Sequence, residues 1–245
     1  MSLFYKRLLG HGLLYFSLVF IIFYFHFTEY RWNEYITKPL TLLILLRFFF
    51  LTGGNLHPGL RKGVVLGLIF SILSDFAFLL RLDISTWFII GTFSFSLLTM
   101  YAYSSGFQFS NKKYLSITDF RSITPINLFL SVLMIAFPIS IFIIEDLELW
   151  QYPAILFQLL MWFLISQGLK RQDHVNELSY YLVLSGIVLY SITTMLLTLQ
   201  NFTQGIFNFK GIPVFTYFTA QFFMVIGTIY QNPKEEPNQT TDITI

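Results

Sequence analysis

One carboxylate stands inside an otherwise apolar stretch of the sequence and is the first candidate for chemistry. Asp75 ends the stretch GLIFSILSD (residues 67–75), and the apolar residues FAFLL follow it. A carboxyl group can donate or accept a proton, which makes it a candidate acid or base. If this stretch crosses a membrane, a charge there costs about 2.5–3.5 kcal/mol even on insertion scales. Asp75 is therefore a candidate functional residue.

Lys38 is the predicted partner of Asp75. It opens the stretch KPLTLLILL, and its segment enters the membrane on the side where the segment that carries Asp75 leaves. Asp75 lies five residues before Leu80, which corresponds to a depth of about 7–8 Å at 1.5 Å per residue. A Lys side chain bridges most of this difference. We predict Asp75 and Lys38 as catalytic residues; the alternative is a buried pair that only fixes helix packing.

Small and polar residues share a helical face with Asp75. At the helical period, one face of residues 63–80 is small or polar and the other is apolar. The first face carries Gly63, Gly67, Ser71, Ser74 and Asp75, and the second carries Ile69, Leu73, Phe76 and Leu80. Small residues four apart let membrane helices approach closely. We therefore expect Asp75 to point into a helix bundle.

Polar residues of other segments are predicted to gather around Asp75 and to line a cavity with it. Each of them alone is more typical of a hydrogen bond between helices than of a ligand contact. Their convergence on one carboxylate favours a binding site. The candidate substrate-binding residues are Ser71, Ser74, Thr99, Tyr190, Thr194, Tyr217 and Gln221.

Composition identifies the class of protein that carries these residues. The 245 residues are 55% hydrophobic and only 11% charged, whereas a soluble domain carries about 25% charged residues. Long apolar runs predict transmembrane helices and not a β-barrel. The chain has no cysteine, and its histidines lack metal-ligand spacing. We predict no cofactor, no metal site and no nucleic-acid partner; no protein partner is implied either.

The expected architecture is an all-α, polytopic membrane bundle of eight transmembrane helices over residues 1–231. A polar, disordered tail is expected at 232–245. The stretch GLIFSILSD (67–75) resembles GIVLYSITT (186–194), which indicates either a parallel four-plus-four repeat or chance similarity. The predicted segments are 8–27, 38–52, 63–80, 86–107, 124–144, 150–169, 179–199 and 212–230, and the second is short enough to borrow from residues 32–37.

The distribution of positive charges predicts the orientation. Cytoplasmic loops of membrane proteins are enriched in Lys and Arg. We therefore expect both termini in the cytoplasm and the protein in the plasma membrane, which is the inner membrane of a bacterium. The predicted cytoplasmic side holds Lys6, Arg7, Arg61, Lys62, Lys112, Lys113, Arg121, Lys170, Arg171 and Lys234; the other side holds Arg31, Lys38, Arg81 and Lys210.

Four short motifs resemble those of the YhhN family of eight-span membrane proteins, which includes the lysoplasmalogenases. The motifs are KPLT (38–41), GLIFSILSD (67–75), GTFSF (91–95) and YFTAQ (217–221), and they occur in the family's order and spacing. The resemblance implies hydrolysis of the vinyl-ether bond of a lysoplasmalogen, which gives a fatty aldehyde and a glycerophospho-alcohol. It also implies two intramembrane aspartates with opposite acid and base roles, of which Asp75 is the first.

Two positions depart from the family pattern. The second aspartate of the family corresponds to Thr194, and its fourth-span histidine corresponds to Thr99. Threonine can orient a water molecule but is not a base near neutral pH. The leading prediction is thus a lysoplasmalogenase-like membrane protein that binds or hydrolyses a lysolipid or ether lipid. The alternatives are a catalytically inactive lipid-binding or structural protein and, third, a small-solute transporter.

Overall fold

The computed structural model describes residues 3–27, 31–80, 86–109, 151–202 and 211–231, and these residues are helical apart from short connections. The predicted fifth segment (124–144) and the predicted tail (232–245) lie outside this part of the chain. The described elements are α1 (Leu3–Phe27), α2 (Arg31–Thr52), α3 (Pro58–Leu80), α4 (Thr86–Gln108), α6 (Gln151–Leu169), the 3₁₀ helix η2 (Lys170–Asp173), α7 (Glu177–Phe202) and α8 (Ile212–Ile229). The all-α prediction is confirmed for them.

The second predicted segment is longer in the structure than its apolar run. Helix α2 begins at Arg31 and contains 22 residues, with Pro39 inside it. At 1.5 Å per residue this length reaches across a hydrocarbon core of about 30 Å. The predicted segment 38–52 alone is short for a membrane span, and the helix does include residues 32–37 as expected.

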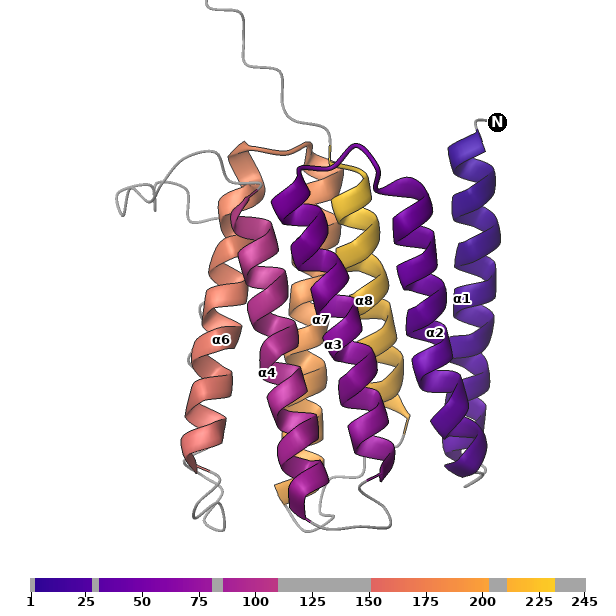
Figure 1. Cartoon of the computed structure of the whole chain (residues 1–245), viewed down its shortest axis with the longest axis vertical. Helices are drawn as coiled ribbons and strands as arrows, with labels where there is room; N and C mark the ends of the chain where they lie inside the picture. Colours follow the sequence, from indigo (N-terminus) through magenta and orange to yellow (C-terminus); the bar gives the residue numbers. More distant parts are fainter. Residues whose placement is uncertain (1–2, 28–30, 81–85, 110–150, 203–210, 232–245) are drawn as a thin grey trace, which may run out of the picture.

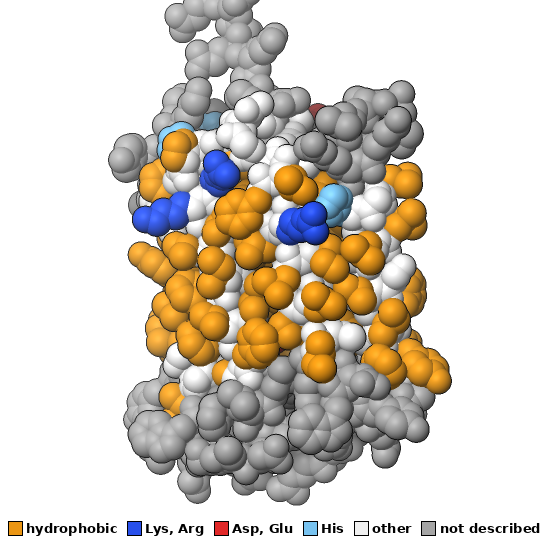
Figure 2. Space-filling model, turned by 45° about the vertical axis from the view of Figure 1, so that its right-hand side comes forward, with side chains coloured by type: hydrophobic (Ala, Val, Ile, Leu, Met, Phe, Trp, Pro, Cys, Tyr) orange, Lys and Arg blue, Asp and Glu red, His pale blue; other side chains and the backbone are white. Residues whose placement is uncertain are grey.

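Three of the described helices are long and apolar enough to cross a membrane. Their apolar windows are Leu8–Phe25, Glu177–Leu197 and Ile212–Ile229. Apolar side chains cover the middle of the face shown in Figure 2, and Lys, Arg and His side chains gather above them, toward one end. A surface that is apolar at its middle and carries its charged side chains toward one end is typical of an integral membrane protein. Eight spans, the orientation and the repeat stay predictions.

Two closely packed helix pairs form the centre of the bundle. Helix α3 packs most extensively against α4, and α7 packs most extensively against α8. Figure 1 shows α1 and α2 on one side of these pairs and α6 on the other. The pairs hold most of the polar side chains described below.

Glycines bring the backbones of each pair together. A Cβ atom on Gly63 would overlap the backbone of Gly106 on α4, and one on Gly186 would lie 2.9 Å from the carbonyl oxygen of Ala220 on α8. These contacts leave no room for a side chain. The predicted small-residue seam of α3 is therefore confirmed.

Candidate functional site

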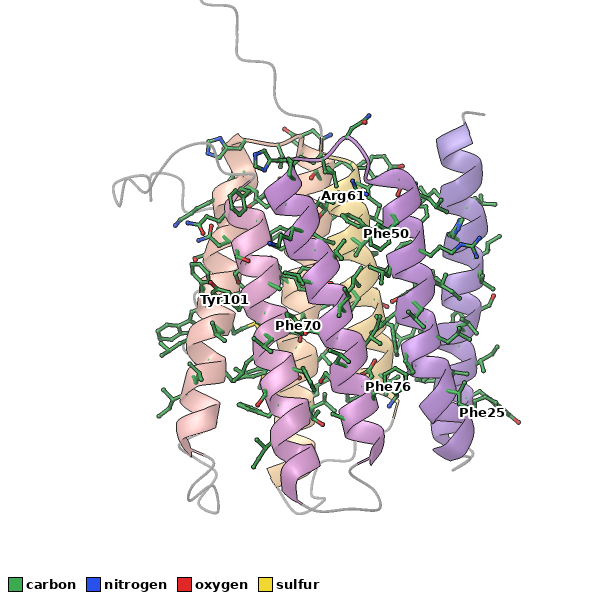
Figure 3. All side chains as sticks on the ribbon, viewed as in Figure 1. Phe25, Phe50, Arg61, Phe70, Phe76 and Tyr101 are labelled. Carbon is green, nitrogen blue, oxygen red and sulfur yellow. The ribbon has the colours of Figure 1, made fainter. Side chains whose placement is uncertain are left out.

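Asp75 lies near the C-terminal end of α3 with one carboxylate oxygen, Oδ2, buried inside the bundle. Its neighbour Phe76 points outward (Figure 3) and is 46% exposed. Ile69 and Leu73 are exposed on the same outer face. The helix thus presents its apolar face to the lipid and its carboxylate to the interior, as the sequence pattern predicted.

Three tyrosines on three other helices lie within electrostatic range of this carboxylate. The charge of Asp75 acts on the hydroxyl groups of Tyr15 on α1, Tyr190 on α7 and Tyr217 on α8. Tyr15 and Tyr190 are buried, and the rings of Tyr190 and Tyr217 lie 6.1 Å apart. These four residues, here called the Asp75 cluster, place one acidic group and three hydroxyl groups within the bundle.

A polar network runs beside the cluster and connects α3, α4 and α8. The hydroxyl of Tyr103 donates to Oε1 of Gln221 at 2.5 Å. Nε2 of Gln221 donates to Oγ of Ser71 at 3.1 Å, and Ser71 donates to Oγ1 of Thr99 at 3.4 Å. Three of the predicted binding residues, Ser71, Thr99 and Gln221, are thus joined by direct hydrogen bonds.

The remaining predicted binding residues make contacts within helices or between neighbours. Oγ of Ser74 donates to the carbonyl oxygen of Thr92 at 3.1 Å, and it lies 2.9 Å from Oγ of Ser96. These contacts connect α3 to α4. Thr194 is half-buried, and its hydroxyl donates to the carbonyl oxygen of Ser191 at 2.8 Å. A role of Ser74 or Thr194 toward a ligand stays a prediction.

Lys38 is half-buried on α2, directly before Pro39. Its pairing with Asp75 stays a prediction. Among the described residues, no group of three His, Cys, Asp or Glu side chains could hold a metal ion. The chemistry that this arrangement supports is proton transfer by Asp75, with hydroxyl groups nearby to orient a substrate or a water molecule.

Tyr15 is the member of the cluster that the sequence did not indicate. It lies on α1, where it shares a buried face with Val19 and Ile22, and its hydroxyl donates to the carbonyl oxygen of Phe218 at 2.7 Å. A usable signal was present, because a tyrosine in the middle of a span, away from the interfacial belts, needs a polar partner inside the protein.

A second buried charge, Arg171, lies at the opposite end of the bundle from Asp75. Its Nη2 donates to Oγ of Ser179 at 3.1 Å, and its guanidinium lies 5.1 Å from the ring centre of Phe107. Burial lowers the pKa of Arg171 to about 9, so it stays charged at neutral pH. Because it connects η2 to α4 and α7, we assign it to packing of this end.

The comparison with known families agrees with the motifs and the geometry. The model of the YhhN family matches residues 33–228, which contain Asp75 and the polar network. The chain belongs to the YhhN family. No curated protein and no solved structure matches it. Helix α1 precedes the matched region, so Tyr15 lies outside the part of this YhhN protein that the family model covers.

Proposed function

We propose that this YhhN protein is lysoplasmalogenase-like: it binds a lysolipid with its ether group at the Asp75 cluster and hydrolyses a vinyl ether slowly. The observation that carries the proposal is a carboxylate with one buried oxygen, within electrostatic range of three tyrosine hydroxyls, inside a lipid-exposed bundle. A single-chain ether lipid has a short polar region and one long apolar chain. This combination matches a small polar site that is surrounded by hydrocarbon.

The proposed reaction begins with proton transfer from the carboxyl group of Asp75. The proton goes to the vinyl carbon that is not bonded to oxygen, and the resulting oxocarbenium charge is stabilised by the carboxylate left behind. Water then adds to the other vinyl carbon and returns a proton to Asp75. The hemiacetal formed in this way splits into a fatty aldehyde and a glycerophospho-alcohol.

One carboxyl group must serve as both acid and base in this reaction. Thr194 stands where the family pattern has its second aspartate, and a threonine hydroxyl does not deprotonate water near neutral pH. The loss of one general acid or base lowers a rate by about 10²–10⁴-fold. We therefore propose weak turnover together with intact lipid binding.

Lys38 has a supporting role in this proposal. An ammonium group within reach of Asp75 favours the carboxylate that remains after proton transfer. Lys38 precedes Pro39 on a half-buried stretch of α2. We propose that it supplies the positive charge of the site.

The proposed orientation places the site toward the outer leaflet of the plasma membrane. Arg61 and Lys62 stand at the start of α3, and Lys170 and Arg171 follow α6. Positive residues mark the cytoplasmic side, whereas Asp75 lies near the other end of α3. With the predicted fifth span at residues 124–144, eight spans would place both termini in the cytoplasm.

A purely lipid-binding protein is the second candidate function. It is favoured by Thr194, whose hydroxyl hydrogen-bonds to the backbone of its own helix, and by the polar network, whose side chains bond to one another. Both candidates share the same ligand and differ only in turnover.

Lipid that co-purifies with the protein tests the ligand class. We expect lysolipid or ether lipid to be enriched in solvent extracts of the purified full-length protein, compared with total lipid from the same membranes, because the Asp75 cluster accommodates one chain and a small polar region. Mass spectrometry of the two extracts measures the enrichment. An extract with the lipid proportions of the bulk membrane would contradict the proposal.

A further inference from the structure

Helix α2 carries a positive charge on its exposed face. Its exposed side chains recur at the helical period, and Arg47 is one of them. The large apolar members of this exposed stripe are Ile36, Leu40, Leu43, Phe50 and Leu51. Arg47 lies five residues before the end of α2 at Thr52, which is about 7–8 Å inside the helix end at 1.5 Å per residue. A charge at this depth on a lipid-facing stripe is costly, so its side chain has to extend toward the headgroups.

Arg61 of α3 reaches the same stripe. It is half-buried near the start of α3, and its guanidinium carbon lies 6.0 Å from the centre of the Phe50 ring on α2. Figure 3 shows both residues toward the same end of the bundle. Phe50 follows Arg47 by three residues, and side chains three apart are neighbours on a helix. Both arginines therefore lie next to Phe50, on two helices that pack against each other.

Lys62 adds a third positive charge and is exposed. Arg47, Arg61 and Lys62 are here called the α2–α3 basic surface. The acidic residues of these two helices are Glu34 and Asp75, and both lie toward the other end of the bundle, near the start of α2 and the end of α3. Helix α1 beside α2 contains no acidic residue. A negative charge that meets this surface must therefore come from outside these three helices.

Apolar side chains continue from the basic surface toward the middle of the bundle. Leu43 precedes Arg47 by one turn on the exposed stripe of α2, and Ile69 and Leu73 are exposed on α3 beyond Lys62. Figure 2 shows the same distribution, with Lys and Arg side chains toward one end of an apolar surface. Positive charge next to exposed hydrocarbon matches a molecule with an anionic head and apolar chains, because each part then meets a complementary surface.

We propose that the α2–α3 basic surface binds the headgroup of an anionic diacyl phospholipid. The guanidinium groups of Arg47 and Arg61 donate charge-assisted hydrogen bonds to the phosphate, and the acyl chains lie along the exposed stripe of α2. A zwitterionic headgroup carries a cationic group of its own, which this surface repels. A free phosphate ion has no chains to contact the stripe. The surface lies at the opposite end of α3 from Asp75, so the proposal is independent of the proposed hydrolysis.

Titration with defined lipids tests the proposal. The full-length protein in detergent is titrated with diacyl phosphatidylglycerol or with phosphatidylcholine of the same chains, and native mass spectrometry measures the bound lipid. We expect phosphatidylglycerol to bind more tightly. Arg47→Gln and Arg61→Gln are each expected to weaken its binding by about fivefold, and together by about thirtyfold, because each basic residue near an anionic lipid contributes about this factor. Arg47 is exposed, so we expect the fold to tolerate its replacement.

Lys170→Gln is the matched control. It removes one positive charge at the same end of the bundle, but Lys170 lies on η2 after α6, on the other side of the central helix pairs from α2 (Figure 1). We expect unchanged binding. Phosphatidylglycerol selectivity that falls only in the arginine variants supports the proposal. Equal binding of the two lipids, equal losses in all three single variants, or displacement of the lipid by inorganic phosphate at constant ionic strength would each overturn it.

Discussion

Thr194→Asp is expected to raise the release of fatty aldehyde from lysoplasmalogen by about 10²–10⁴-fold, the range that one general acid or base contributes. Thr194 lies one helical turn after Tyr190 on α7, and the hydroxyl of Tyr190 lies in the field of Asp75. We expect an aspartate at position 194 to add a second carboxyl group near the first. Two nearby carboxyl groups have different pKa values, because the negative charge of one disfavours ionisation of the other. One can therefore act as an acid and the other as a base.

Aldehyde release by purified protein in lipid vesicles measures this gain. Thr194→Asn is the matched control, because its amide has nearly the same size as the carboxylate but does not transfer protons at neutral pH. Equal rates for the native, Asn and Asp proteins, all folded, would show that position 194 is not part of the reacting site.

Gly63→Leu is expected to destabilise the bundle by about 3 kcal/mol or more, at the upper end of the range for overpacked sites. The atoms that a side chain would meet are the backbone of Gly106 and the carbonyl oxygen of Ala102. Backbone atoms of two helices cannot move aside as a flexible side chain can. The α3–α4 pair would have to separate, and with it the contacts of Ser71 and Ser74.

The thermal unfolding midpoint and the monodisperse fraction on size-exclusion chromatography measure this effect in detergent. Gly10→Leu is the matched control, because Gly10 is also helical but has no atom within 4 Å of the position of an added Cβ. A Gly63→Leu protein as stable as the control would mean that α3 and α4 do not approach as closely as described.

The inward face of α3 could be predicted because it depends on one helix alone. The spacing of Gly63, Gly67, Ser71 and Asp75 sets which side of α3 is small and polar, and a helix buries such a side against its neighbours. The same reasoning predicted that Phe76 faces outward, and it is exposed.

Contacts between distant helices could not be predicted in the same way. The hydrogen bond between Tyr103 and Gln221 joins residues 118 positions apart, and helical periodicity carries no information on which helices are neighbours. Tyr15 was missed for this reason. Its role depends on the packing of α1 against α8, which an apolar sequence of almost uniform character does not reveal.

The central claim is that Asp75 is the proton donor of a lysolipid site. The most direct test is aldehyde release from lysoplasmalogen by the native and Thr194→Asp proteins, each with and without Asp75→Asn. Asparagine keeps the size and polarity of the side chain, but its amide is neither an acid nor a base near neutral pH. We predict slow release by the native protein and faster release by Thr194→Asp, with both lost in Asp75→Asn while lysolipid binding persists. Turnover that survives Asp75→Asn would contradict the account.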